Sequence, residues 1–294
     1  MNSSKFSFSN IYIILFLFLF TAITNIALSI EISNKQFSHF SLEDGLSQAT
    51  AQTMLYDSQG FLWVGTTDGL NKYDGYQFKI YRHNPDDNKS ISSNDLISSM
   101  EDSTGNLWFG TNGQGITLFD KKTEGFTHFK FLENESTSLS HGVVKTIAQD
   151  KKGGLWFGTK KGLNHLIRAS DKFIHFNQPL ETGINASDLD INYLLPDNNK
   201  IWIATANSGL FYFDLVSQSF TAIPVDNVSS TITSMVKFNG TQIMLGTDDG
   251  VAFLDINSLK TISHKPLSIL KNQYISSLLL EDDNLWIGNK NGGY

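Results

Sequence analysis

The segment "GFLWVGTTDGLNKYDG" (residues 60–75) places a tryptophan among apolar residues and follows it with Gly-Thr and a second glycine. The same order returns as "GNLWFGTNGQGITLFD" (105–120) and "GGLWFGTKKGLNHL" (153–166), and in weaker form at 200–214, 241–255 and 284–294. The equivalent positions in the six copies are Trp63, Trp108, Trp156, Trp202, Met244 and Trp286. Their spacing of 42 to 48 residues is typical of propeller blades or helical arrays.

Each copy is expected to contain four short strands. In the first three copies an opening run ends in Asp57, Asp102 or Asp150, and a glycine follows three residues later. Asp-x-x-Gly is a turn signature, because the Asp side chain accepts from backbone amides and glycine adopts a positive φ without a Cβ penalty. The tryptophan strand follows, then a third strand after the second glycine, then a short aromatic and β-branched run such as "QFKIY" or "KFIHF".

Four short strands per period, with no sustained helical periodicity, predict an all-β fold. We expect a β-propeller of four-stranded antiparallel blades, with about six blades present and the last one incomplete. In such a radial array each sheet is covered by its neighbours, so a large flat side chain at one fixed place per blade fills the wedge between sheets. We therefore interpret the tryptophans as packing residues, with a ligand-stacking surface as the alternative.

Composition excludes several classes of protein. The chain has 294 residues, of which 40% are hydrophobic and 17% charged, and this is too apolar for a disordered protein. A net charge of −7 without a basic stripe argues against nucleic-acid binding. The absence of cysteine excludes disulfides and thiolate zinc sites, so the hydrophobic core must stabilise the fold alone.

The N-terminus is expected to be a separate segment. Lys5 precedes the apolar run "IYIILFLFLF" (11–20), and small residues follow by Ala27 and Ser29. This order predicts a secretory signal peptide over residues 1–29. An uncleaved N-terminal anchor is the alternative, because residues 11–30 are just long enough to cross a bilayer. Either reading predicts that the propeller domain, residues 30–294, is exported.

The residues from Asp57 to Asp74 follow the pattern D-x-x-G-x-L-W-x-G-T-x-x-G-L-N-x-Y-D, and the run from Phe78 to Leu96 leads into the next copy. This pattern resembles the two-component regulator propeller repeat. The opening "FSLEDGLSQATAQTMLYDSQGFLWVGTTDGLNKYDGYQF" is similar to the start of the periplasmic sensor half of membrane-bound bacterial signalling proteins. The resemblance runs from about residue 37 to the end and weakens where Ala204 and Met244 replace the usual Gly and Trp.

The resemblance implies tandem propellers outside the inner membrane, a β-sandwich, a membrane span, and a cytoplasmic histidine kinase or diguanylate cyclase. No histidine-phosphorylation segment, nucleotide-binding glycine box, cyclase motif or second span occurs in the 294 residues. We therefore expect an extracytoplasmic ligand-sensing input domain, itself not an enzyme, that lacks its output domain. The resemblance also implies a small-molecule or oligosaccharide ligand and a homodimer in the full-length receptor.

Two other function classes stay open at this point. The chain could be a self-standing exported propeller that acts as a binding or scaffold module. A polysaccharide-active enzyme is less favoured, because no convergent group of acids, and no Ser-His-Asp order or nucleophile elbow, is visible. At the ends, "QFSHFS" (36–41) resembles a fourth strand and "NLWIGNKNGGY" (284–294) stops where a third strand begins. These ends predict a truncated product with open sheet edges, and the total blade number stays open.

No catalytic, cofactor-binding or metal-ligating residue is predicted. Paired acids at Asp86-Asp87, Asp248-Asp249 and Asp282-Asp283 are expected in solvated turns rather than in a calcium or acid–base site. Histidines recur in or just after the fourth strand, which favours a place in the blade over a metal cluster; they are His39, His83, His128, His175 and His264.

Function is therefore expected to reside in loops. Along antiparallel strands, the connections between copies and the second-to-third strand connections emerge on one face, and the Asp-x-x-Gly turns on the other. The longest connections are 83–95, 131–142 and 177–188. Because binding residues usually lie on loops of a rigid scaffold, these loops predict a ligand surface on their face.

Overall fold

The computed structural model describes residues 39–225, 228–262, 270–282, 284–290 and 292–293. The predicted signal peptide or anchor (1–29) lies outside the described residues, and the described part of residues 37–294 forms one compact unit. Within the described part of the chain, no helix has both the length and the apolar character needed to span a bilayer.

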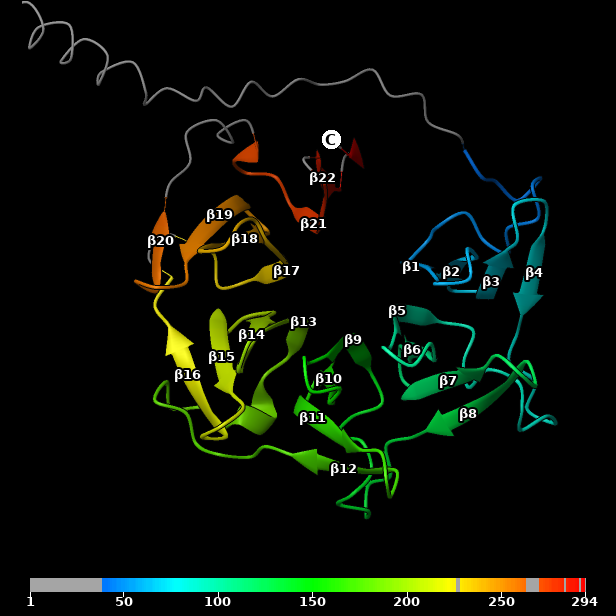
Figure 1. Ribbon diagram of the computed structural model, residues 1–294, viewed down its shortest axis with the longest axis horizontal. Coiled ribbons are helices and arrows are strands. Elements are labelled where there is room, and N and C mark those ends of the chain that lie inside the picture. Colours follow the sequence, from blue (N-terminus) through cyan, green and yellow to red (C-terminus); the bar gives the residue numbers. More distant parts are fainter. Residues whose placement is uncertain (1–38, 226–227, 263–269, 283, 291, 294) are drawn as a thin grey trace, which may run out of the picture. The chain divides into compact units, whose positions relative to one another are not determined.

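The described residues form six antiparallel sheets (Figure 1). The first three sheets are β1 Thr53–Tyr56, β2 Leu62–Thr66, β3 Gly69–Tyr73 and β4 Phe78–Tyr81; β5 Leu96–Glu101, β6 Leu107–Thr111, β7 Ile116–Asp120 and β8 Gly125–Phe129; β9 Val144–Gln149, β10 Leu155–Thr159, β11 Gly162–Ile167 and β12 Lys172–His175. The last three are β13 Ile191–Asp197, β14 Lys200–Thr205, β15 Leu210–Asp214 and β16 Ser219–Ile223; β17 Ile232–Lys237, β18 Gln242–Thr247, β19 Gly250–Asp255 and β20 Lys260–Ile262; β21 Ile275–Glu281, β22 Asn284–Asn289 and β23 Gly292–Gly293. A short 3₁₀ helix, η1 (Ala186–Asp188), precedes β13.

These sheets confirm the predicted propeller. Strands pair in chain order within each sheet, and the innermost strands β1, β5, β9, β13, β17 and β21 pack beside one another in succession. Five sheets have four strands and the sixth has three, as the incomplete last copy predicts. Strands β1 and β21 lie apart in Figure 1, whereas every other pair of consecutive innermost strands adjoins.

The tryptophans fill the wedges between sheets. Trp63, Trp108, Trp156 and Trp202 are each no more than 4% exposed, and Met244 is fully buried. Each packs on the following sheet; Trp63, for example, contacts Phe119 of the second sheet with ring centroids 4.8 Å apart. Each wedge residue thus joins one sheet to the next, and the packing interpretation is confirmed for these five copies. Trp286 of the sixth sheet is half-buried.

In the first three sheets a glycine two residues after the tryptophan, within the same strand, allows the next innermost strand to approach closely. A Cβ atom at Gly158 would lie 2.5 Å from Ile191 Cγ2, and one at Gly110 would lie 2.4 Å from the Val144 carbonyl oxygen. No larger side chain fits there without moving the neighbouring strand. In the fourth sheet Ala204 takes this position and is fully buried.

One expected strand is not formed. The described end of the 36–41 segment, residues 39–41, is not in a strand, and a turn begins at Leu42. Asp44 accepts hydrogen bonds from the Ser41 amide and hydroxyl. The aromatic signal reflects packing instead, because the ring of Phe40 lies 4.9 Å from that of Tyr73 and 5.5 Å from that of Phe78. The strand prediction was therefore wrong for residues 39–41.

Candidate functional site

The propeller has two faces of different construction. The connections between sheets lie on the same face as the second-to-third strand connections, because they hydrogen-bond to each other; Gly69 N donates to Asn94 O, Gly115 N to Gly142 O and Gly162 N to Leu189 O. We call this the loop face. The Asp-x-x-Gly turns and the third-to-fourth strand connections lie at the opposite ends of the strands, on what we call the turn face. The predicted division of the loops between two faces is confirmed.

Part of each predicted binding loop is structural. Ile91 and Leu139 are fully buried below the loop face. The next residue in each loop is tied to the sheet that follows: Ser92 Oγ lies 2.6 Å from Thr117 Oγ1, and Ser140 N donates to Asn164 Oδ1. The second halves of loops 83–95 and 131–142 are thus pinned to the sheet that follows.

Histidines contribute to this pinning. His128 Nε2 donates to the Ser90 carbonyl at 2.7 Å, and His175 Nε2 donates to the Ser138 carbonyl at 2.6 Å. His83 Nδ1 contacts the Ile91 carbonyl at 2.7 Å. These three histidines have a place in the blade, as expected. His39 is exposed, and His264 lies outside the described residues.

A groove of 480 Å³ opens on the loop face between the second and third inter-sheet connections. It is lined by two of the three predicted loops and by the second-to-third connection of the third sheet. The lining residues are Phe131, Leu132, Glu133, Glu135, Ser136, Leu139, Ser140, His141, Lys161, His175, Asn177, Ser187 and Asp188. The structure thus joins loops 131–142 and 177–188 in one concave site, and loop 83–95 does not line it.

Aromatic and charged groups meet in this loop-face groove. The ring of Phe131 stacks on that of His141 with centroids 6.3 Å apart and planes inclined by 21°. Phe131 is 43% exposed and lies beside Leu132, which is 55% exposed, so the groove has an accessible apolar wall. Burial, and the nearby charges of Lys160 and Lys161, lower the pKa of His141, so its ring is neutral at pH 7. Lys161 and Asp188 lie 3.8 Å apart at the rim.

The turn face is built on a repeated Asp–Trp pair that sequence reasoning missed. Asp57, Asp102 and Asp150 each accept two turn amides through Oδ1, as the turn signature predicts. Their Oδ2 atoms accept the indole N–H groups of Trp63, Trp108 and Trp156 at 2.8 to 2.9 Å. The constant spacing of six residues between Asp and Trp was the signal available in the sequence.

Most of these buried carboxylates also receive a cation from the following sheet. Arg168 donates to Asp102 Oδ2 at 2.9 Å, and Lys121 Nζ lies 3.9 Å from Asp57 Oδ2. Burial opposes ionisation of Asp102, but hydrogen bonds from Thr104, Trp108 and Asn106 lower its pKa overall. Asp57 and Asp102 thus link neighbouring sheets through ion pairs. We call the contact between each turn Asp and the sheet that follows a turn-face joint.

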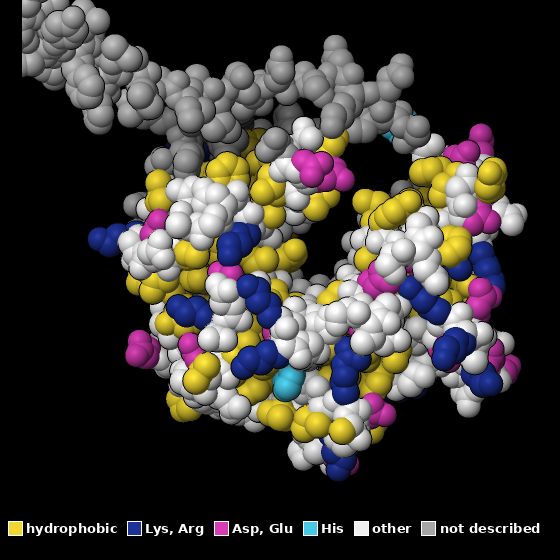
Figure 2. Space-filling view, in the orientation of Figure 1, with side chains coloured by type: hydrophobic (Ala, Val, Ile, Leu, Met, Phe, Trp, Pro, Cys, Tyr) yellow, Lys and Arg dark blue, Asp and Glu magenta, His cyan; other side chains and the backbone are white. Residues whose placement is uncertain are grey.

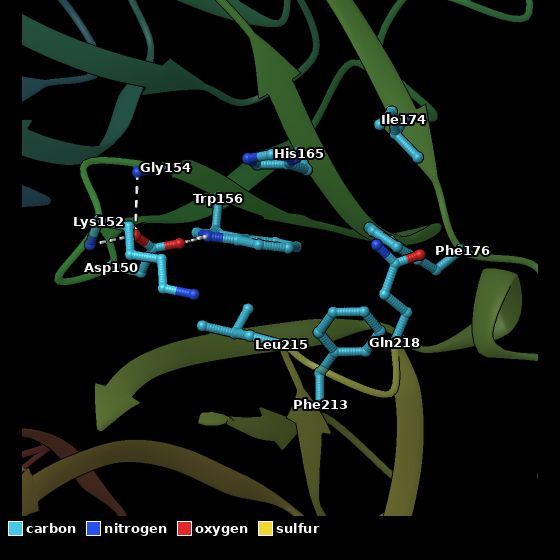
Figure 3. Close-up of a pocket in the computed structure, with 10 residues that line it drawn as sticks. All are labelled: Asp150, Lys152, Gly154, Trp156, His165, Ile174, Phe176, Phe213, Leu215 and Gln218. Carbon is cyan, nitrogen blue, oxygen red and sulfur yellow. Dashed lines mark hydrogen bonds between the residues drawn. The ribbon is translucent and has the colours of Figure 1, made fainter. Parts of the chain in front are cut away.

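The third of these joints contains a second pocket (Figure 3). Its volume is 290 Å³, and it lies between the third and fourth sheets. The lining residues are Asp150, Lys152, Gly154, Trp156, His165, Ile174, Phe176, Phe213, Leu215 and Gln218. Figure 3 shows the carboxylate of Asp150 at one end and the rings of Phe176 and Phe213 at the other, with His165 stacked over Trp156.

The paired acids lie in solvated turns where the structure describes them. Asp86, Asp87, Asp248, Asp249 and Asp282 are exposed, and Asp283 lies outside the described residues. Asp87 Oδ1 accepts the Lys89 amide, which closes the local turn. Among the described residues, no three His, Asp or Glu side chains are grouped so that they could hold a metal ion. On the face seen in Figure 2, basic and acidic side chains are interspersed over several sheets.

Three segments of the chain are similar to a known family of repeats. Residues 45–68, 90–113 and 138–161 match the family model described as two component regulator propeller. A 67-residue segment is 54% identical to Histidine kinase P4 of Formosa agariphila, and it amounts to 23% of this chain and 5% of that relative.

Solved structures agree with this match. The extracellular domain of a hybrid two-component system from B. thetaiotaomicron superposes with a TM-score of 0.76 at 25% identity, over 87% of this chain and 34% of that one. A second such extracellular domain from B. thetaiotaomicron gives a TM-score of 0.57 at 19% identity, over 83% of this chain and 42% of that one, which shows the fold alone.

The chain thus spans a small part of the relatives it matches. Each matched segment begins in the connection before a sheet and ends just after its tryptophan strand, so it holds the pinned loop half, the Asp turn and the Trp wedge. The resemblance drawn from the sequence is confirmed: one segment in each of the first three copies is similar to the two component regulator propeller model.

Proposed function

We propose that this propeller is the extracytoplasmic, periplasmic ligand-sensing region of a two-component signalling protein, exported by its N-terminal segment. The observation that carries the proposal is the likeness to the extracellular domain of a hybrid two-component system, which extends over 87% of this chain, together with the three matching repeats. The histidine kinase named among the relatives supports a kinase as the output. In this proposal the propeller is the input region, and the kinase would be a separate domain of the signalling protein.

The ligand is proposed to bind in the loop-face groove. This groove is concave, it joins two of the long inter-sheet loops, and it combines an aromatic pair with carboxylates and a lysine. An oligosaccharide suits these groups, because the apolar face of a sugar ring packs on an aromatic face while its hydroxyls hydrogen-bond to charged side chains. The neutral ring of His141 extends the aromatic face without adding a charge.

A thermal-shift panel of defined neutral and acidic oligosaccharides tests this proposal. We expect at least one of them to raise the unfolding midpoint of the chain, since a ligand that binds only the folded state stabilises it. Phe131→Ala and His141→Ala should each remove that shift. Tyr76→Ala is the matched control, because Tyr76 is an aromatic residue that is 95% exposed in a third-to-fourth strand connection on the turn face.

A binding oligosaccharide whose midpoint shift survives both groove substitutions would refute the proposed site. Signalling is tested separately in the cell, by comparing the transcripts that respond to that oligosaccharide in strains with and without the gene. Loss of the response supports the sensor role. An unchanged response, with binding intact, would support the self-standing binding module instead.

A further inference from the structure

The turn-face joint between the third and fourth sheets differs from its neighbours in one respect. One residue directly follows the third strand of each sheet: Lys121 in the second sheet, Arg168 in the third and Leu215 in the fourth. Lys121 and Arg168 reach back to the buried Asp of the preceding sheet, but the equivalent residue in the fourth sheet is Leu215. Within the described part of the chain, no lysine, arginine or histidine side chain forms an ion pair with Asp150.

The fourth turn aspartate strengthens this contrast. Asp197 is also buried, and Lys237 of the fifth sheet donates to its Oδ1 at 2.7 Å. Three of the four buried turn aspartates of the described propeller therefore have a cation from the next sheet, and Asp150 is the exception. A buried carboxylate is stabilised by a nearby opposite charge, and no cation among the described residues supplies one to Asp150.

The pocket stands where a cation lies in the other joints. The carboxylate of Asp150 accepts hydrogen bonds from Lys152 N, Gly154 N and Trp156 Nε1, at 2.8 to 3.0 Å, and lies next to a cavity of 290 Å³. That volume gives room for about ten water-sized groups, since a water molecule occupies about 30 Å³ of liquid.

Aromatic rings form the remaining walls. The ring centroids of Phe176 and Phe213 lie 4.6 Å apart, and each lies within 6 Å of the indole of Trp156. The imidazole of His165 stacks on Trp156 at 4.2 Å. Burial lowers the pKa of His165, although Asp150 opposes this effect, so the ring adds an uncharged surface at pH 7. Aromatic faces beside a carboxylate are the usual surroundings of a bound organic cation.

We propose that this pocket binds a small organic cation, whose ammonium or guanidinium group pairs with Asp150 and whose apolar stem packs against the partly exposed Phe176 and Leu215. The exposed Lys152 at the pocket opposes this binding through its like charge, but its side chain is solvated. The site lies on the turn face and is built from residues that the loop-face groove does not use. Its test is therefore independent of the proposed oligosaccharide sensing.

The probe is 2-phenylethylammonium, and 2-phenylethanol is its neutral isostere. Isothermal titration of the full chain at pH 7 should give a dissociation constant on the order of 1 mM or below for the cation, and at least about tenfold weaker binding for the alcohol. Leu215→Arg should place a guanidinium on Asp150, as Arg168 does on Asp102, and should abolish binding of the cation. Because Leu215→Arg fills the pocket from within, its unfolding midpoint should be unchanged or higher.

Val216→Arg is the matched control. It adds the same charge one residue away, on a side chain that is 72% exposed and does not line the pocket, so cation binding should persist. Asp150→Asn is the second variant, which removes the negative charge while keeping the side-chain shape, and it should also lose the cation. The proposal is overturned if the wild type does not bind the cation, if the alcohol binds as tightly, or if Leu215→Arg or Asp150→Asn binds the cation like the wild type.

Discussion

The Asp–Trp pair of the turn face predicts that two equally buried tryptophans differ in their contribution to stability. Trp63 and Trp202 are each 1% exposed, and a lysine ammonium lies 5.4 Å from the first ring and 5.9 Å from the second. Trp63 Nε1 donates to Asp57 at 2.9 Å. The buried Nε1 of Trp202 has no acceptor among the described residues, because the fourth copy has a shorter hairpin in place of the Asp-x-x-Gly turn.

Substitution of each tryptophan by phenylalanine isolates this difference. Both variants lose a similar volume from the wedge between sheets. Trp63→Phe also loses a hydrogen bond to a charged group, worth about 1.5–3 kcal/mol, whereas Trp202→Phe removes a buried unpaired donor whose burial costs about 1–3 kcal/mol. The lower ends of these ranges add to about 2.5 kcal/mol, so Trp63→Phe should be the less stable variant by at least about that amount.

Urea unfolding of the two variants, followed by circular dichroism, measures the difference. Thermal midpoints should differ by about 5 °C or more, since about 1 kcal/mol shifts the midpoint of a domain of this size by about 2–4 °C. In an Asp57→Asn background Trp63→Phe should be less destabilising, because the charged acceptor is gone. Equal destabilisation by Trp63→Phe and Trp202→Phe would refute the role given to the Asp–Trp pair.

Three further outcomes follow from the packing and the charges. Gly158→Ala should destabilise the fold by about 1–3 kcal/mol in urea unfolding, because the added Cβ would overpack the next innermost strand. Gly240→Ala, whose added Cβ meets nothing within 4 Å, should be nearly neutral. Similar values for the two variants would contradict the close approach of the strands. The pKa of Asp102 is lowered in the folded state, so its ionised form stabilises the fold above the unfolded-state pKa of about 3.9, and this stabilisation is lost as the pH falls through the folded-state pKa. The difference in unfolding free energy between the wild type and Asp102→Asn should therefore narrow below about pH 4. A difference that widens there would contradict this sign. The pKa of His165 is lowered in the folded state, so below about pH 6.5 the unfolded chain takes up a proton more readily and the free energy of unfolding falls. Between pH 7 and pH 5 the thermal midpoint of His165→Gln should therefore decline less than that of the wild type. An equal decline would refute this contribution of His165.

The fold followed from the sequence because each local signal agrees with the propeller. The Asp-x-x-Gly turns were predicted from the conformation that Gly60, Gly105 and Gly153 must adopt, and all three have positive φ values of 83° to 89°. The wedge role of the tryptophans followed from their recurrence. Residues 39–41 were wrongly expected in a strand, because the apolar character of Phe40 serves packing against the first sheet, and a short pattern does not separate these two uses.

The site could be predicted only as a surface. Loops 131–142 and 177–188 were expected on one face, but their union in a groove depends on side chains such as Phe131 and His141, whose stacking is set by the folded loop. The ion pair between Asp102 and Arg168 joins residues 66 positions apart. No periodic pattern within one copy reveals such a contact, because it is made across the boundary between two sheets.

The division of the propeller into a recognition face and a structural face is tested most directly by hydrogen–deuterium exchange. The chain is measured alone and with the oligosaccharide that gives the largest thermal shift. The proposed function predicts slower exchange in loops 131–142 and 177–188 and unchanged exchange in the turns at Asp57–Gly60 and Asp102–Gly105. Protection confined to those turns, with the two loops unchanged, would contradict it.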